Sequence, residues 1–289
     1  MSKLHFNKMT IIGAGLIGSS LARAVRQLGL VRHLAIGDAD QEHCDYCLKS
    51  GFADSATTDL ATAVHDADLI LLATPVGTFA DIAATIMPHV KPGAILTDVG
   101  SVKQSVIDSI AAVLPADVQF VPGHPIAGTE FSGPESGFAE MFRGRWCILT
   151  PLPRTSLPAL GAVQDLWEAV GSQVTIMPAD HHDQVLALTS HLPHLIAFSI
   201  LNTAADLGEH IQNEVMQYSI SLRGFTRVAA SDPVMWRDIF LTNRDAVLEQ
   251  LHLLQEDLAV LTRAIRWGDG DLLEQRFARA REIRRNLPD

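Results

Sequence analysis

A glycine motif near the start of the chain constrains the fold more than any other feature. Residues 13–18 read GAGLIG, directly after the strand-like run MTII and at the start of the helix-like run SSLARAVRQLG. Glycines at these positions let the backbone approach a pyrophosphate, and the helix N-terminus adds free amides and its positive dipole end. A GxGxxG pattern gains its meaning from this strand-to-helix context. We therefore predict a dinucleotide site that includes Gly13, Gly15, Leu16, Ile17 and Gly18.

An acidic residue follows the motif at the spacing that ribose recognition requires. Asp38 ends the next strand-like run, LAIGD, and lies 20 residues after Gly18. A carboxylate there binds the ribose hydroxyls and repels a 2′-phosphate, so we predict NAD as the cofactor rather than NADP. Two alternatives stay open: Asp40 could take this role, or Asp38 could be a solvated residue that begins the turn DADQ.

Strand-like and helix-like segments alternate over the first two-thirds of the chain. Apolar runs occur at MTIIGAG, LAIGD, LILLATP, AILTDVG, VQFVPG, WCILTP and QVTIM, with helical spacing at residues 19–28, 78–87 and 103–114. This alternation predicts an α/β Rossmann-like domain with a mainly parallel sheet, which we expect to gain an irregular extension after Phe120.

Ligands of such sheets lie over the carboxyl ends of the strands. Thr74, Pro75 and Val76 end one strand-like run and are therefore placed at the cofactor, and Ser101 follows another. The alternative is that Ser101 and Lys103 are only a helix cap and a first-turn residue.

The character of the chain changes after residue 178. Residues 179–289 contain no convincing strand, whereas HLIAFSILNTAADL and AVLEQLHLLQEDLAVLTRAIRW have helical periodicity. We expect a dinucleotide-binding domain at residues 1–178 and an all-α substrate-binding and dimerisation domain at residues 179–289. The second run has a longer apolar stripe than a small domain can bury alone, so we predict a homodimer built on these helices.

Composition excludes several other classes of protein. The 289 residues carry a net charge of −11, which argues against a nucleic-acid partner because such binding needs a concentrated basic surface. No apolar run approaches the length that spans a bilayer, and no signal region precedes the glycine motif, so we expect a cytoplasmic protein. Cys44 and Cys47 form an isolated CxxC pair on a helix-like stretch, which favours packing over zinc or redox chemistry. No metal is expected.

Residues 121–133, VPGHPIAGTEFSG, have little helix or strand character but carry a histidine, a threonine and a glutamate. His124 lies between Gly123 and Pro125, and Thr129 and Glu130 follow in the same loop. A histidine with a pKa near its usual value of about 6.5 can accept a proton at neutral pH. From these residues alone the segment is either a polar connection or a rigid mount for chemistry.

Six dispersed motifs decide between these interpretations. They read GAGLIGSSLA, TPV, TDVGSVK, GHPIAGTEFSG, SHLPH and TRVAASDPVMWRDI, and together they span most of the chain. In these motifs and their order the chain resembles the prephenate dehydrogenases and their relatives that act on arogenate. The resemblance implies oxidative decarboxylation of prephenate to 4-hydroxyphenylpyruvate, with hydride transfer to NAD, in tyrosine biosynthesis.

The resemblance also implies roles for individual residues. His124 bonds the substrate hydroxyl, Ser101 lies beside it, and Arg227 grips the ring carboxylate. In SHLPH, Ser190 and His194 take substrate-side roles, with His194 orienting or bonding the substrate.

Other matches are more loosely defined. Thr129 and Glu130 lie on the substrate side of their loop, and Glu130 either pairs with a basic residue or gates access. Arg223 lies near the substrate side chain or on the surface, and Trp236 lies near the pocket or packs in a helix. His191 is expected to be structural, and RD at residues 237–238 is expected to be an ion pair or a cap.

One stretch departs from the family pattern. Relatives carry a GGFRD-like sequence before the TR motif, where this chain reads ISLRG at residues 220–224. Loss of the acid would weaken binding of the ammonium group of arogenate, which favours prephenate as the substrate. An arogenate or dual-specificity cyclohexadienyl dehydrogenase is the alternative. A non-catalytic dinucleotide sensor and a generic hydroxyacid or imine oxidoreductase are further alternatives, although neither explains GHPIAGTE together with SHLPH.

Overall fold

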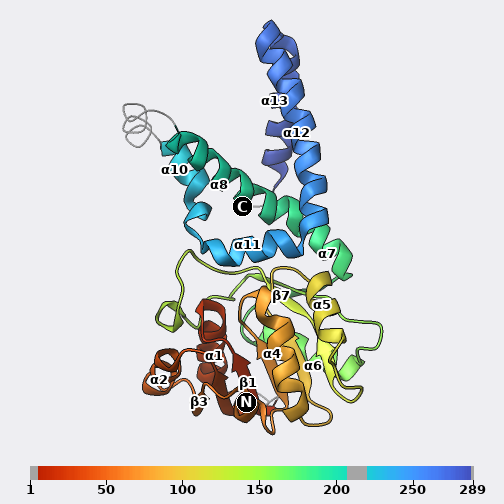
Figure 1. Ribbon diagram of the computed structural model, residues 1–289. Coiled ribbons are helices and arrows are strands. Elements are labelled where there is room, and N and C mark those ends of the chain that lie inside the picture. Colours follow the sequence, from red (N-terminus) through yellow and green to blue (C-terminus); the bar gives the residue numbers. More distant parts are fainter. Residues whose placement is uncertain (1–5, 207–219, 288–289) are drawn as a thin grey trace. The chain divides into compact units, whose positions relative to one another are not determined.

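The computed structural model describes residues 6–206 and 220–287, which fall into two compact units, Met1–Arg244 and Asp245–Asp289. The first unit is built on a six-stranded parallel sheet with strand order β3-β2-β1-β4-β5-β6 (Figure 1). Its strands are β1 (Phe6–Ile12), β2 (Val31–Gly37), β3 (Ser55–Thr57), β4 (Leu69–Leu72), β5 (Ile95–Asp98) and β6 (Gln119–Val121). This is the strand order of a doubly wound dinucleotide-binding sheet, which confirms the predicted Rossmann-like fold.

Helices cover both faces of this sheet. One hydrophobic layer involves α1 (Leu16–Leu28), α2 (Gln41–Lys49) and α6 (Leu157–Ala169). The other involves α3 (Leu60–Val64), α4 (Phe79–Ile86) and α5 (Gln104–Ala111). The helices predicted at residues 19–28, 78–87 and 103–114 are thus confirmed as α1, α4 and α5. Cys44 and Cys47 are both buried on α2 with free thiols.

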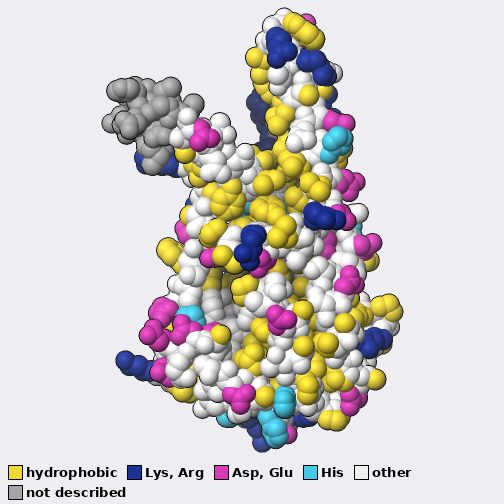
Figure 2. All heavy atoms as spheres, in the orientation of Figure 1, with side chains coloured by type: hydrophobic (Ala, Val, Ile, Leu, Met, Phe, Trp, Pro, Cys, Tyr) yellow, Lys and Arg dark blue, Asp and Glu magenta, His cyan; other side chains and the backbone are white. Residues whose placement is uncertain are grey.

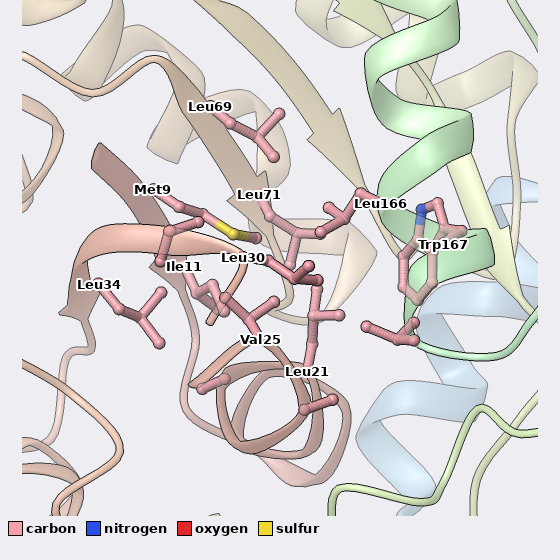
Figure 3. Packing of buried hydrophobic residues seen from close by; sticks show 14 of the residues in the cluster. Met9, Ile11, Leu21, Val25, Leu30, Leu34, Leu69, Leu71, Leu166 and Trp167 are labelled. Atoms are coloured by element: carbon pink, nitrogen blue, oxygen red, sulfur yellow. The ribbon is translucent and has the colours of Figure 1, made fainter. Parts of the chain in front are cut away.

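The side chains of β4 alternate between these two layers. Leu69 and Leu71 belong to the layer of α1 and α6, where Trp167 lies, as Figure 3 shows. Ile70 and Leu72 belong to the opposite layer. A strand that is buried on both faces needs apolar residues at every position, which explains the uninterrupted run LILL.

The sequence led us to expect that the later strands extend the main sheet irregularly. They instead form a second sheet of three strands. β7 (Gly123–Pro125) runs antiparallel to β8 (Trp146–Leu149), and β8 runs parallel to β9 (Gln173–Ile176). His124 therefore lies on a short strand rather than in an irregular loop, paired with Ile148. The change of sheet occurs at Pro122, between β6 and β7.

After β9, the described residues that are not in turns or loops are helical. The first unit contains α7 (Ala179–Leu186), a π turn η4 (Ala187–His191), α8 (Leu192–Ala205), α10 (Ile220–Thr226) and α11 (Pro233–Thr242). Pro193 has no N–H, so the Thr189 carbonyl cannot receive an α-helical hydrogen bond from it, which accounts for the wide turn at this point. Leu207, the last residue of the predicted run HLIAFSILNTAADL, lies outside the described residues.

The second unit is a pair of helices, α12 (Arg244–Trp267) and α13 (Gly270–Asn286). An ion pair of 2.9 Å between Arg276 Nη1 and Asp257 Oδ1 joins them. This division of the contacts lies at residue 244, whereas the change from mixed α/β to helical structure follows Ile176. The predicted domain boundary at residue 178 remains a prediction.

One expectation about hydropathy was wrong. The continuous helical run Ala179–Ala205 is long and apolar enough to cross a membrane, judged by length and composition only. It contains the buried residues His182, Asp183 and His191, which form hydrogen bonds within the first unit. Hydrophobic side chains gather over the α8 region in Figure 2, and Ile200 is among those that are exposed.

Candidate active site

The glycine motif makes close backbone contacts at two positions and leaves open space at a third. Gly13 has a φ of +99°, and a Cβ there would lie 2.7 Å from the Ala73 carbonyl carbon. A Cβ on Gly18 would lie 2.0 Å from the Gly13 oxygen. A Cβ on Gly15, the N-cap of α1, would meet no atom within 4 Å. This open space beside a helix N-terminus without a side-chain cap fits a pyrophosphate, and the next two residues begin α1.

Asp38 directly follows β2 and is held against the glycine turn. Its Oδ2 accepts a hydrogen bond from the Ala14 amide at 2.6 Å, and its Oδ1 accepts one from the Asp40 amide at 2.9 Å. Nδ1 of His43 lies 3.3 Å from Oδ1. The Asp40 carboxylate instead caps α2 by accepting from the Glu42 amide at 2.8 Å. The two acids therefore have different surroundings, and Asp38 is the one beside the glycine turn.

The turn after β4 lies at the same edge of the sheet. Thr74 Oγ1 is 2.8 Å from Thr78 Oγ1, and Thr78 Oγ1 donates to the Pro75 carbonyl at 2.8 Å. Val76 then begins a short 3₁₀ turn. Because β1 and β4 are neighbours where the strand order reverses, this turn borders the predicted dinucleotide site.

A fully buried ion pair joins the end of β5 to the strand that carries the predicted base. Lys103 Nζ contacts Asp98 Oδ1 and donates to the Gly123 carbonyl at 2.7 Å. The Asp98 carboxylate accepts from the Gly100 amide at 2.8 Å and the Gly123 amide at 3.3 Å. Lys103 is therefore not only a first-turn residue, the alternative that the sequence left open. The pair fixes the backbone of Gly123, directly before His124.

His124 is 8% exposed, and its ring contacts a second histidine. Nδ1 lies 2.8 Å from Nε2 of His182, and Nδ1 of His182 lies 2.8 Å from Asp183 Oδ1. Burial lowers the pKa of His124 well below its usual value, and the charges of His182, Lys103 and His191 lower it further. The expectation of a pKa near 6.5 was thus wrong, because the site excludes water from this ring.

The SHLPH motif spans the end of the π turn and the start of α8. His194 Nδ1 donates to the Ser190 carbonyl at 2.8 Å, and its ring stacks on Trp236 at a centroid distance of 3.7 Å. Asn243 Nδ2 donates to His191 Nδ1 at 3.1 Å. Burial lowers the pKa of His191 to about 4, although Asp183 and the Ser101 backbone act in the opposite direction. Ser101 thus lies near this motif.

Arg227 and Glu130 form an ion pair across 97 residues of sequence, with Nη1 3.2 Å from Oε2. Burial lowers the pKa of His194, and the nearby charge of Arg227 lowers it further. Thr129 and Arg223 are both exposed. The expected ion pair at residues 237–238 is confirmed, with the guanidinium Nη2 2.7 Å from the carboxylate.

The predicted residues therefore gather in local groups. Within residues 6–206 and 220–287, no direct hydrogen bond joins His124 to Ser101, His194 or Arg227. Sequence reasoning assigned no individual site role to the residues that hold these groups in place, namely Asp98, Lys103, His182, Asp183 and Asn243. The only signal for any of them was TDVGSVK, in which Asp98 and Lys103 are five residues apart.

Family models match almost the whole chain. Residues 21–176 match the model described as prephenate dehydrogenase, nucleotide-binding domain. Residues 178–279 match the model described as prephenate dehydrogenase, dimerization domain. Both halves of the molecule thus resemble the same kind of enzyme.

Individual relatives agree with these matches. The cyclohexadienyl dehydrogenase of Zymomonas mobilis is 41% identical over 280 residues, which cover 96% of this chain and 95% of that protein. The prephenate dehydrogenase of Bacillus subtilis is 30% identical, covering 96% of this chain and 75% of that protein. The crystal structure of prephenate dehydrogenase from Aquifex aeolicus in complex with hydroxyphenyl propionate and NAD+ has a TM-score of 0.87 and 33% identity, covering 96% of this chain and 97% of that one.

Proposed function

Because this chain belongs to the prephenate dehydrogenase family, we propose that it catalyses the oxidative decarboxylation of prephenate to 4-hydroxyphenylpyruvate, a step in tyrosine synthesis. The chain is an NAD-linked dehydrogenase, and its glycine turn offers the open space that the cofactor needs. The dehydrogenation of a cyclohexadienol that bears a ring carboxylate requires a base at the hydroxyl, a cation at the carboxylate and a fixed ring orientation. The residues described above supply each of these.

His124 is the proposed base. Its Nδ1 is engaged with His182, so Nε2 is the nitrogen left to accept the proton of the substrate hydroxyl. NAD, when bound, accepts the hydride from the carbon that bears this hydroxyl. Loss of the ring carboxylate as carbon dioxide then makes the ring aromatic, and His124 returns its proton to the same oxygen, which has become phenolic. A base of lowered pKa suits this return, because its protonated form is short-lived.

The observation that carries this proposal is that His124 is buried beside the carboxyl end of β5, one of the strands of the dinucleotide-binding sheet. Burial keeps the ring unprotonated at neutral pH, as a proton acceptor must be. The ion pair between Asp98 and Lys103 fixes the preceding backbone. A histidine of a non-catalytic sensor would have no need for this support.

Arg227 is the proposed partner of the ring carboxylate. Its side chain is 63% exposed and is paired with Glu130, so an incoming carboxylate can take the place of this acid. We assign His194, Ser190 and Ser101 to orientation of the substrate, because His194 stacks on Trp236 and bonds the Ser190 carbonyl, and the Ser101 backbone bonds His191 of the same motif. Thr129 and Arg223 stay as proposed contacts near the substrate side chain.

Oligomeric state and domain organisation belong to the same proposal. We assign the helices after residue 178 to a substrate-binding and homodimerisation domain, supported by the match to a dimerization domain model over residues 178–279. Exposed apolar side chains on this part, such as Leu188, Ile200 and Leu241, support burial against a second copy. The cytoplasmic location remains a prediction.

The test is a comparison of prephenate and arogenate, each with NAD and with NADP, in which formation of reduced nicotinamide is followed. We expect turnover of prephenate with NAD. An observation favours a second candidate, a dual-specificity cyclohexadienyl dehydrogenase, because the 41% identical relative from Zymomonas mobilis carries that name. Comparable kcat/KM for both substrates would establish this candidate, and turnover of neither would refute the proposed function.

A further inference from the structure

We propose that His182, oriented by Asp183, is a positioning residue that fixes the tautomer of His124 so that its Nε2 is the proton acceptor. This inference rests on the proposed function, in which His124 is the base. Neither His182 nor Asp183 belongs to the residues that the sequence motifs singled out. Both lie on α7, 58 and 59 residues after His124, and the fold brings His182 into contact with the His124 ring and Asp183 into contact with His182.

The direction of the hydrogen bonds follows from Asp183. Its Oδ1 accepts from the Lys103 amide at 2.8 Å, and its Oδ2 accepts from the Gln104 amide at 2.9 Å, both at the N-terminus of α5. Both oxygens of this carboxylate thus accept from backbone N–H groups, so the side chain is placed as a hydrogen-bond acceptor. It can therefore only accept from His182, so Nδ1 of His182, 2.8 Å away, carries the proton.

The tautomer of His124 is the consequence. His182 is completely buried, and this burial lowers its pKa despite the opposing effect of Asp183, so the ring is neutral at neutral pH. A neutral ring protonated at Nδ1 has an acceptor at Nε2. His124 must then donate from its own Nδ1, 2.8 Å away, and its Nε2 is left without a proton.

Neighbouring residues hold the hydrogen-bonded series Asp183–His182–His124 in place. Asn243 Nδ2 donates to the Asp183 carbonyl at 2.9 Å as well as to His191 Nδ1 at 3.1 Å. The hydrogen-bonded series Asp183–His182–His124 is thus anchored to α5 on one side and to Asn243, which follows α11, on the other. The charges that act on the ring of His124 are those of His182, Lys103 and His191, and those that act on His182 are Asp183, Lys103 and Asp98.

Two substitutions at position 182 separate the two hydrogen bonds. In His182→Gln the amide oxygen can reach the place of Nε2 and still accept from His124. In His182→Asn the shorter amide can replace the Nδ1 donor toward Asp183 but leaves His124 without an acceptor. Since general base catalysis contributes about two to four orders of magnitude, we expect His182→Asn to lower kcat by about 30-fold or more. We expect His182→Gln to lower it by less than about 5-fold, with the Kd for NAD unchanged in both.

His181→Asn is the matched control, since this histidine precedes His182 on the same helix and is exposed. It should leave kcat unchanged. Equal losses of kcat in His182→Asn and His182→Gln, with normal folding by circular dichroism, would overturn the proposal, because a merely structural role does not distinguish an acceptor from a donor.

A second measurement does not depend on turnover. Long-range ¹H–¹⁵N NMR of the full chain labelled with ¹⁵N-histidine, assigned with His124→Asn, reports which ring nitrogen carries the proton. We expect His124 to be protonated at Nδ1 at pH 7.5, and a His124 protonated at Nε2 would overturn the proposal. The spectrum is independent of the substrate, so it would still decide the tautomer if neither prephenate nor arogenate were turned over.

Discussion

Replacement of Lys103 by methionine tests whether the buried ion pair stabilises the strand of His124. Methionine keeps most of the volume of the side chain but removes the charge. The Asp98 carboxylate, which is 0% exposed, then has no cation, and the Gly123 carbonyl loses its donor at 2.7 Å. Loss of one member of a buried pair costs about 3–5 kcal/mol, which is a large part of the total stability of a domain, roughly 5–15 kcal/mol.

The chain offers a matched control in which the same residue types meet at the surface. Lys91 Nζ contacts Asp68 Oδ1 and donates to the Asp66 carbonyl at 3.1 Å, so it also has one carboxylate and one carbonyl partner. Its side chain is 35% exposed, and exposed pairs contribute about 0–1 kcal/mol. We therefore expect Lys91→Met to lower the free energy of unfolding by less than about 1 kcal/mol.

The assay is urea unfolding at one fixed protomer concentration, followed by circular dichroism. The double variant with Asp98→Asn and Lys103→Met should lose less free energy of unfolding than the two single variants together, by about 1.5 kcal/mol or more, because the double variant leaves no uncompensated charge. Additive losses, or a Lys103→Met variant as stable as Lys91→Met, would show that the pair does not stabilise the fold.

The remaining predictions concern pH and the cofactor. Burial lowers the pKa of His191 to about 4. Between pH 6.5 and pH 4 the unfolded chain therefore binds a proton at this histidine and the native chain does not. Roughly 3 kcal/mol of the free energy of unfolding should be lost as the pH falls over this range. The Tm should fall accordingly over this range, and less steeply in His191→Gln. Asp38→Ala should reduce discrimination against NADP about tenfold or more in kcat/KM, whereas Asp40→Ala should only destabilise the cap of α2; equal effects would contradict the ribose role. Gly15→Ala should weaken NAD binding, measured by calorimetry, without a change in Tm. Gly18→Ala should weaken NAD binding and also lower the Tm, because only a Cβ on Gly18 meets backbone, 2.0 Å from the Gly13 oxygen. A stable Gly18→Ala variant would contradict this reasoning.

Much of the main sheet could be predicted because its strands are buried on both faces. Runs such as LILL at residues 69–72 need no partner to be identified as strands. β3 and β7 could not be identified in this way, since neither SAT at residues 55–57 nor GHP at residues 123–125 is an apolar run. β7 contains only Gly123, His124 and Pro125, and glycine and proline are depleted in strands. Its pairing with β8 depends on contacts between distant residues.

The site was predicted where a motif is local and missed where a contact is distant. The glycine turn and Asp38 follow from spacing, because one βαβ unit positions both. His182 and Asp183 lie in ADHHDQVL, a polar stretch in which no pattern distinguishes the buried histidine from His181. Lys103 is charged and fully buried, which is rare, and only its partner Asp98 explains it.

The π turn sets the angular register of the helix that carries the histidines. An α-helix turns by about 100° per residue, so one extra residue in a turn displaces every later side chain by about that angle around the axis. His182 on α7 and His194 on α8 lie on opposite sides of this turn in sequence, and Ser190 and His191 lie within it. The wide turn therefore acts as a rotational offset between two halves of one helical run. A single-residue deletion there would redirect the face that carries His194 while leaving His182 in place.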